Sequence, residues 1–253
     1  MASSDIDAGP RPGLDESALR DLRGALRGEV LTNADEGYQT HRRVWNGSID
    51  RRPRVIVRCT GVDDVRAAVA FGRRHDLPIA LRGGGHSFPG LSTVDDGLLV
   101  DLRPMDRIEV DPQARTARAQ AGLLLEEVDA ATQPHGLAVP AGIVSHTGLA
   151  GLTLGGGIGW IMRRHGLTVD QLTGVELVTA DGDVVRADEE ETPTCSGPSA
   201  AVAATSAWSR RSTSGWCRSA RRSSREWPSG RRRMARRCCG STATGWASAP
   251  TTS

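Results

Sequence analysis

The chain has 253 residues, enough for one large domain or two small ones, and its 32 basic and 30 acidic side chains leave a formal net charge of +2. No apolar run approaches the length of a transmembrane helix, and the first 20 residues lack the apolar stretch of a secretory signal. These features predict a cytoplasmic protein with no membrane partner. A charged fraction of 25% is ordinary for a folded domain and argues against disorder of the whole chain.

The charge is unevenly distributed along the chain. Residues 1–191 contain 21 Arg and 29 acidic residues, a net charge of −8, whereas residues 192–253 contain 11 Arg and one acid, a net charge of +10. We call residues 192–253 the C-terminal segment. It has no Leu, Ile, Phe or Tyr, yet it holds four of the five cysteines and four of the six tryptophans. Its composition therefore differs from that of the rest of the chain.

Residues 14–187 read as alternating helices and strands. Apolar residues at helical spacing, such as Val65, Ala68 and Val69, predict a helix over 61–75. The pair Asp181-Gly182 predicts a hairpin turn. In chain order, the expected elements are a helix at 14–27, a strand at 55–58, the helix at 61–75, strands at 78–82 and 97–102, a hairpin over 108–120, a helix at 124–133 and the hairpin over 175–187.

Two glycine-rich stretches are candidates for a ligand site. The first, Arg82-Gly-Gly-Gly-His86-Ser87, follows a predicted strand, and its glycines expose backbone N–H groups that could wrap a pyrophosphate. A plain tight turn would explain this stretch equally well. The second is a loop from Gly151 to Trp160, and it follows a further Gly- and Ser-bearing stretch at 140–148. Together, the stretches suggest a large phosphate-bearing ligand approached by backbone from two sides.

The glycine spacing fits neither of two common nucleotide motifs. A Rossmann fingerprint requires a third glycine where Trp160 stands, and no acidic residue follows at the expected distance. A Walker loop requires a lysine, and the chain contains none.

Among the histidines, His86 has two interpretations. A lone loop histidine is commonly a solvated or hydrogen-bonding residue, but its place directly after three glycines also favours a functional role. His135, His146 and His165 lack the spacing of metal ligands, so we assign them no chemistry and predict no metal site.

Two long strings resemble a known family. They are PRVIVRCTGVDDVRAAVAFGRRHDLPIALRGGGHSFPGLSTVDDGLLVDLRPMDRIEV, from Pro53, and AGIVSHTGLAGLTLGGGIGWIMRRHGLTVDQLTGVELVTADGDVVRA, from Ala141. They resemble the FAD-linked oxidases of the vanillyl-alcohol oxidase and p-cresol methylhydroxylase (PCMH) superfamily, in particular the berberine-bridge-enzyme-like oxidases. The resemblance implies an α+β fold with a two-subdomain, PCMH-type FAD-binding domain. The implied boundaries are an N-terminal segment at 1–27 with a disordered start, an incomplete FAD-binding domain at 28–191, and the C-terminal segment.

The resemblance also implies which residues bind FAD. His86 matches the histidine that bonds covalently to the flavin 8α carbon. Val144 stands where some members carry a cysteine for a second bond, so one bond is expected. The implied FAD-binding residues are Arg82, Gly83, Gly84, Gly85, His86, Ser87, Gly90, Gly142, Val144, Thr147, Gly148, Gly151, Gly155, Gly156, Gly157, Gly159, Val175 and Val178.

The implied reaction is flavin-dependent oxidation of an alcohol, sugar or related carbon. Hydride would pass to flavin N5, with dioxygen as acceptor, so the expected partners are a small-molecule substrate and dioxygen. The catalytic base would belong to a substrate domain, and no residue of this chain is assigned that role. Two alternatives stay open: an inactive FAD-domain fragment, and a nucleic-acid-binding protein that uses its basic C-terminal segment.

The C-terminal segment reads as coding sequence in a displaced frame. Codons that permit the residues from Thr192 onward, started one base earlier, spell N-P-D-L-F-W-A-L-R-G-G-G-G-N-F-G-V-V-T, which resembles the motif that follows in the family. Such a frame explains the Arg, Ser, Trp and Cys content. The cysteine spacings of 22, 21 and 1 match no zinc site, and no nucleic-acid role is expected. With little large apolar surface, the segment is predicted to be disordered.

Overall fold

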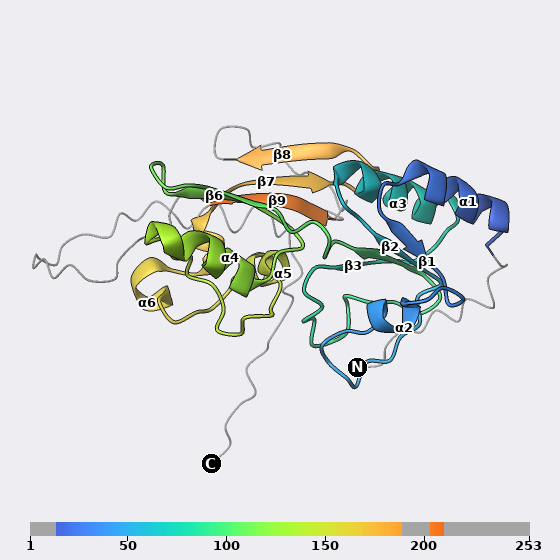
Figure 1. The fold of residues 1–253 in the computed structure, drawn as a ribbon, viewed down its shortest axis with the longest axis horizontal. Coiled ribbons are helices and arrows are strands. Elements are labelled where there is room, and N and C mark those ends of the chain that lie inside the picture. The colour runs from blue at the N-terminus through green and yellow to red at the C-terminus, as the bar shows by residue number, and fades with distance from the viewer. Residues whose placement is uncertain (1–13, 189–202, 210–253) are drawn as a thin grey trace, which may run out of the picture. The chain divides into compact units, whose positions relative to one another are not determined.

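The computed structural model describes residues 14–188 and 203–209, which form a four-stranded and a five-stranded sheet within one compact unit (Figure 1). The four-stranded sheet has the order β1-β2-β4-β3. Its strands are β1 (Glu29–Leu31), β2 (Val55–Arg58), β3 (Ile79–Arg82) and β4 (Leu98–Asp101). Strands β2, β3 and β4 are parallel, and β1 pairs antiparallel with β2.

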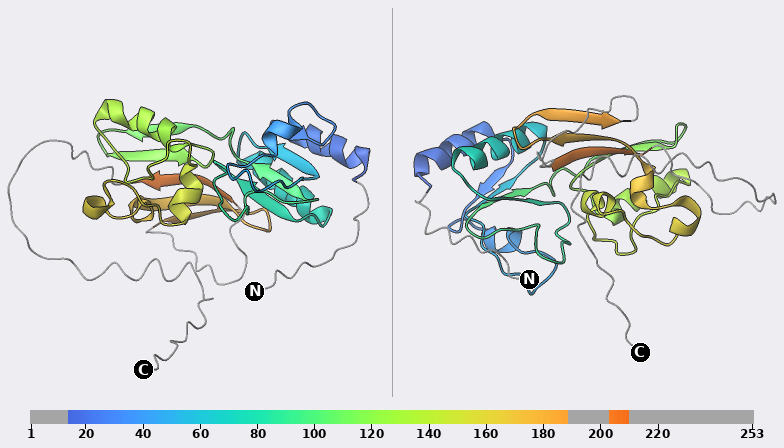
Figure 2. Two further views of the ribbon diagram at one scale, coloured as in Figure 1. Left: turned by 90° about the horizontal axis from the view of Figure 1, so that it is seen from below. Right: turned by 180° about the vertical axis from the view of Figure 1, so that it is seen from behind.

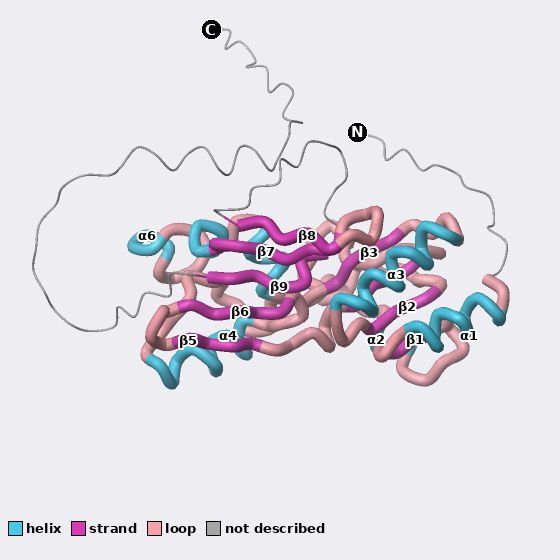
Figure 3. The backbone as a smooth tube through the Cα atoms, turned by 90° about the horizontal axis from the view of Figure 1, so that it is seen from above, coloured by secondary structure: helices cyan, strands magenta, loops and turns pink. Residues whose placement is uncertain are grey.

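Helices α1 (Glu16–Ala25) and α3 (Val62–Arg74) lie beside this sheet, as Figure 3 shows, and α2 (Tyr38–His41) is a single turn. Strands β2 and β4 are apolar at successive positions because both faces of the sheet are covered. Val57 and Val100 pack with Val65 and Val69 of α3 in one core cluster. The Asp64 carboxylate accepts the backbone N–H of Thr60 at 2.8 Å, so it anchors the first turn of α3.

The five-stranded sheet is antiparallel throughout, with the order β5-β6-β9-β7-β8 (Figure 2). Its strands are β5 (Ile108–Asp111), β6 (Thr116–Gln120), β7 (Leu172–Val178), β8 (Val184–Asp188) and β9 (Ala203–Ser209). The segments between β6 and β7 form α4 (Leu125–Thr132), η1 (Gln133–His135), α5 (Leu149–Leu154), α6 (Met162–His165) and η2 (Thr168–Gln171). Val178 of β7 is fully buried in the same core cluster as α3, which joins this sheet to the four-stranded one.

The α+β fold expected from the sequence is confirmed, and every helix and strand predicted between 14 and 187 is present within a few residues. One expectation needs correction. Residues 149–154 are helical, so the second glycine loop begins at Gly155 and not at Gly151. Within the C-terminal segment, residues 203–209 form β9, which pairs with β6 and β7.

The remaining parts of the C-terminal segment, at 192–202 and 210–253, lie outside the described residues, as does the start of the chain at 1–13. They include four of the five cysteines and all 11 Arg of the C-terminal segment. Within the described ranges, no helix is both long and apolar enough to cross a membrane.

Candidate functional site

The first predicted glycine stretch and the Gly- and Ser-bearing stretch at 140–148 meet backbone to backbone. A Cβ atom built on Gly84 would lie 2.2 Å from the backbone nitrogen of Gly148, and one built on Gly148 would lie 2.3 Å from the nitrogen of Gly84. Side chains at either position would force the two loops apart. Glycine is therefore required here by the close approach of the two segments. The two stretches therefore lie side by side, and that they bind one ligand stays a prediction.

The first loop presents a row of free backbone donors. No residue within 14–188 or 203–209 accepts a hydrogen bond from the N–H groups of Gly83 to Ser87. Gly85 has a φ of +72°, which turns the chain sharply after β3. Successive N–H groups in such a turn form an anion-binding concavity, so this loop fits the pyrophosphate of FAD.

His86 lies between two aromatic rings. The indole of Trp45 stacks on its imidazole, with ring centroids 5.1 Å apart and planes inclined by 19°. On the other side, Nδ1 of His146 is 2.8 Å from Nε2 of His86. Partial burial lowers the pKa of His86 from its ordinary value, and the neighbouring His146 lowers it further. The contacts with Trp45 and His146 hold the His86 ring in a fixed orientation.

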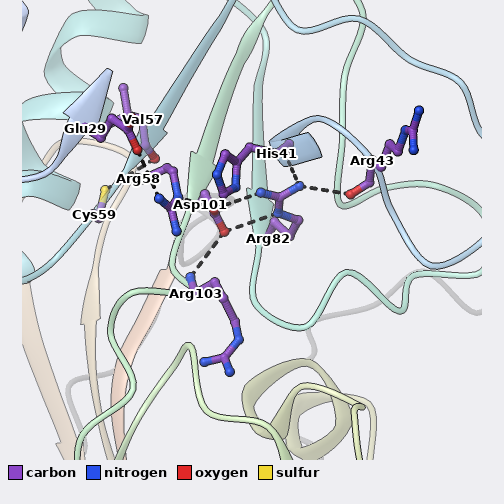
Figure 4. A network of polar contacts seen from close by, with 9 residues as sticks. All are labelled: Glu29, His41, Arg43, Val57, Arg58, Cys59, Arg82, Asp101 and Arg103. Carbon is purple, nitrogen blue, oxygen red and sulfur yellow. Dashed lines mark hydrogen bonds and ion pairs between the residues drawn. The ribbon is translucent and has the colours of Figure 1, made fainter. Parts of the chain in front are cut away.

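The Arg82 side chain is part of a buried network and not of the loop surface (Figure 4). Its Nη2 lies 2.7 Å from Oδ2 of Asp101 and its Nε 3.2 Å from Oδ1. Its Nη1 donates to the carbonyls of His41 and Arg43. The guanidinium thus ties the end of β3 to β4 and to the α2 turn. Any contact that Arg82 makes with FAD must come from its backbone.

The second glycine loop is also shaped by close backbone approaches. A Cβ atom on Gly159 would lie 1.7 Å from the carbonyl oxygen of Ala141, and one on Gly157 would lie 2.1 Å from Oγ1 of Thr168. Gly156 and Gly157 have φ values of +104° and +73°. These contacts explain three of the predicted glycines as requirements of the fold.

The other predicted site residues divide into exposed and enclosed positions. Val144 is 42% exposed and is therefore accessible. Ser87 accepts a hydrogen bond from the N–H of Leu91 at 3.0 Å within its own loop. Val178 is fully buried, so only its backbone could contact a ligand. Gly142 and Thr147 lie on either side of Val144 in the stretch at 140–148. Gly151 lies inside α5, and Gly155 is the C-cap of that helix. Gly90 has a φ of +77°, and Val175 lies on β7.

Two residues that contact His86 are not among the predicted site residues. They are Trp45, in the loop after α2, and His146, to which the sequence pattern assigns no chemistry. His146 stands two residues before Gly148, as His86 stands two residues after Gly84. The sequence does not show that these two histidines are close, because that follows from the contact between Gly84 and Gly148. No group of three or more His, Cys, Asp or Glu residues in the described part of the chain could hold a metal ion.

Comparison with known proteins agrees with this geometry. The sequence profile of a family described as "FAD binding domain" matches residues 53–188, more than half of the chain. The chain belongs to this family of FAD-binding domains, which its relatives among the FAD-linked oxidoreductases share. Their superfamily is that of vanillyl-alcohol oxidase and p-cresol methylhydroxylase, and the berberine-bridge-enzyme-like proteins are among the structural relatives.

Two curated relatives illustrate the similarity. The FAD-linked oxidoreductase YgaK of Bacillus subtilis is 39% identical over 62% of this chain and 35% of its own length. The (R)-6-hydroxynicotine oxidase of Paenarthrobacter nicotinovorans is 34% identical over 67% of this chain and 37% of its own length. The chain thus spans little more than a third of the length of these relatives.

Solved structures show the same fold. The 6-hydroxy-D-nicotine oxidase of Arthrobacter nicotinovorans superposes with a TM-score of 0.70 at 32% identity, over 73% of this chain and 42% of that protein. A glucooligosaccharide oxidase of Acremonium strictum, described with a 6-S-cysteinyl, 8α-N1-histidyl FAD, has a TM-score of 0.69 at 28% identity over 77% of this chain and 42% of that protein.

Gly148→Ala is expected to weaken FAD binding at least about tenfold, because its Cβ would lie 2.3 Å from a backbone nitrogen and the two loops must separate. Gly47→Ala is a matched control, since no atom lies within 4 Å of a Cβ built there. Titration of the apoprotein with FAD, followed by quenching of flavin fluorescence, measures both affinities. Equal affinities for the two variants would contradict the role of the contact between Gly84 and Gly148.

Proposed function

We propose that residues 28–191 form the FAD-binding domain of an oxidase that acts on an alcohol, a sugar or a related carbon, and that His86 bonds covalently to the flavin. The observation that carries this proposal is that the first glycine loop meets the stretch at 140–148 beside His86. There, backbone N–H donors adjoin an imidazole that Trp45 and His146 orient. Bound FAD would supply two-electron chemistry, with hydride passing to flavin N5 and dioxygen as the acceptor.

Each part of the site has a definite task in this proposal. The N–H groups of Gly83 to Ser87 would bind the two phosphates. Trp45 and His146 orient the ring of His86. Val144 has no nucleophilic atom, so a second bond of the cysteinyl kind has no partner in this chain at that position.

The proposed class of substrate is inferred from the names of similar proteins. The similar proteins include a nicotine oxidase and, at 25% identity with a TM-score of 0.70, a xylooligosaccharide oxidase of Myceliophthora thermophila. Both oxidise small molecules, as their names state. A small-molecule substrate is therefore proposed for this protein, with dioxygen as its second partner.

The decisive experiment is acid precipitation of the purified, yellow protein. The unaltered chain should keep its flavin in the pellet, and His86→Ala should release all of it into the supernatant because the imidazole that forms the bond is absent. His135→Ala is the control, since that histidine lies at the end of η1. Release of flavin from the unaltered chain would refute attachment through His86. A chain that takes up no flavin at all would be the inactive fragment.

A further inference from the structure

His146 lies against the proposed attachment residue in an arrangement that the sequence did not reveal. Its Nδ1 is 2.8 Å from Nε2 of His86, and the ring centroids are 4.8 Å apart. Two imidazole nitrogens at this distance share one proton, so one ring donates and the other accepts. Which nitrogen of His86 carries a lone pair therefore depends on which ring donates this hydrogen bond.

The contact is built by the backbone. Gly84 and Gly148 abut, and His86 and His146 are each two residues from this contact. The N–H of Thr147 donates to the carbonyl of Val144 at 3.0 Å, which closes a turn around His146. The indole of Trp45 stacks on the face of His86, and the backbone N–H of Trp45 donates to the carbonyl of Gly85 at 3.1 Å. The two imidazoles are thus fixed by main-chain contacts on both loops.

We propose that His146 is the positioning residue for covalent attachment of the flavin. In this arrangement, Nδ1 of His146 accepts the Nε2–H of His86 and leaves the lone pair on Nδ1 of His86 free to attack the flavin 8α carbon. The inference rests on the proposed function, because it requires that His86 is the site of attachment. It adds a residue that determines how fast that bond forms.

In the attachment step, a C–H bond of the flavin 8α-methyl group breaks and its proton leaves to solvent, while the bond between the 8α carbon and Nδ1 of His86 forms. The Nε2 proton of His86 passes to Nδ1 of His146. The electron pair of the broken C–H bond stays in the flavin, which is left reduced by two electrons. Dioxygen then takes this pair and two protons, giving hydrogen peroxide and oxidised, covalently bound flavin.

Without His146, the proton on His86 has no fixed acceptor and either tautomer can form. Positioned proton acceptors accelerate such steps by about 10²–10⁴-fold. His146→Ala should therefore attach FAD about 100-fold more slowly. His146→Gln retains an accepting side-chain oxygen and should attach FAD faster than His146→Ala. Non-covalent FAD affinity should stay within about twofold of the unaltered chain in both variants, because the N–H donors of the loop are unchanged.

The test uses the full 253-residue chain, purified from riboflavin-limited cells and incubated with FAD in air. Intact mass measured at timed points gives the fraction that carries covalent flavin, and fluorescence titration gives FAD affinity. Imidazole added to His146→Ala should restore part of the rate, which a structural role would not allow. His135→Ala serves as the control variant.

The rate of flavin attachment in the His146 variants decides whether His146 is a positioning residue. Slow attachment in His146→Ala, with partial recovery in His146→Gln or by imidazole, supports the positioning role. Attachment of His146→Ala at the unaltered rate overturns it, as does a loss of rate that parallels a loss of FAD affinity. If the unaltered chain itself binds FAD but never attaches it, the covalent part of the proposed function fails, and this inference fails with it.

Discussion

Asp101→Ala is expected to lower the free energy of unfolding by about 3–5 kcal/mol, because it leaves the buried guanidinium of Arg82 without its carboxylate. The Asp101 side chain is 1% exposed and that of Arg82 8% exposed, so water cannot replace the lost partner. Asp101 also accepts the N–H of Arg103 at 3.2 Å and lies 3.5 Å from Nε of Arg58. The loss is a large fraction of the roughly 5–15 kcal/mol that stabilises a typical domain.

The control is an exposed ion pair of similar length. Nη1 of Arg73 lies 3.0 Å from Asp181, with side chains 52% and 61% exposed. Arg73→Ala should cost less than about 1 kcal/mol. Urea unfolding in the presence of FAD measures both changes. A loss for Asp101→Ala no larger than that of the control would show that Asp101 is not the partner that holds Arg82.

Elements with a strong local pattern could be predicted from the sequence. The helix α3 follows from its apolar spacing, and the β7–β8 hairpin follows from Asp181-Gly182. Strand β1 has only three residues and forms by pairing with β2, so its local sequence is too short to predict a strand. Helix α5 was not predicted, because Gly151 within it is typical of a loop. The helix is stabilised by Leu149, which packs in a buried cluster, and by the hydrogen bond that Thr153 Oγ1 donates to the carbonyl of Leu149 at 2.8 Å.

The site could be predicted only in part, for a related reason. Consecutive glycines indicate exposed N–H groups, so both loops were recognised from local sequence. The role of Arg82 depends on Asp101, which belongs to the next strand, and that of His146 depends on a contact 60 residues away. Long-range contacts of this kind follow from the packing of loops against one another, and local spacing carries no information about them.

Restoring the reading frame near codon 191 should convert this chain into a longer protein that retains flavin in a one-to-one ratio. Counted from Thr192, the displaced frame places G-G-N-F-G-V-V on the seven residues of β9, Ala203–Ser209. This strand is central in its sheet, paired with both β6 and β7. Phe and Val favour a strand with covered faces, and each contributes about 1.5–3 kcal/mol when fully buried.

Sequencing of the gene around and beyond codon 191 checks the frame directly, and the displaced frame should stay open for several hundred bases. The restored and unaltered proteins are then compared by flavin absorbance per chain and by urea midpoint, with FAD present. The restored protein should have the higher value in both, because the central strand gains Phe and two Val where the present chain has Ser206, Trp208 and Ser209. An early stop codon in the displaced frame would contradict the displaced-frame interpretation. β6 and β7 lose their shared pairing partner if β9 fails to form. Equal urea midpoints would therefore show that the present sequence of β9 stabilises the sheet as well as the restored sequence does.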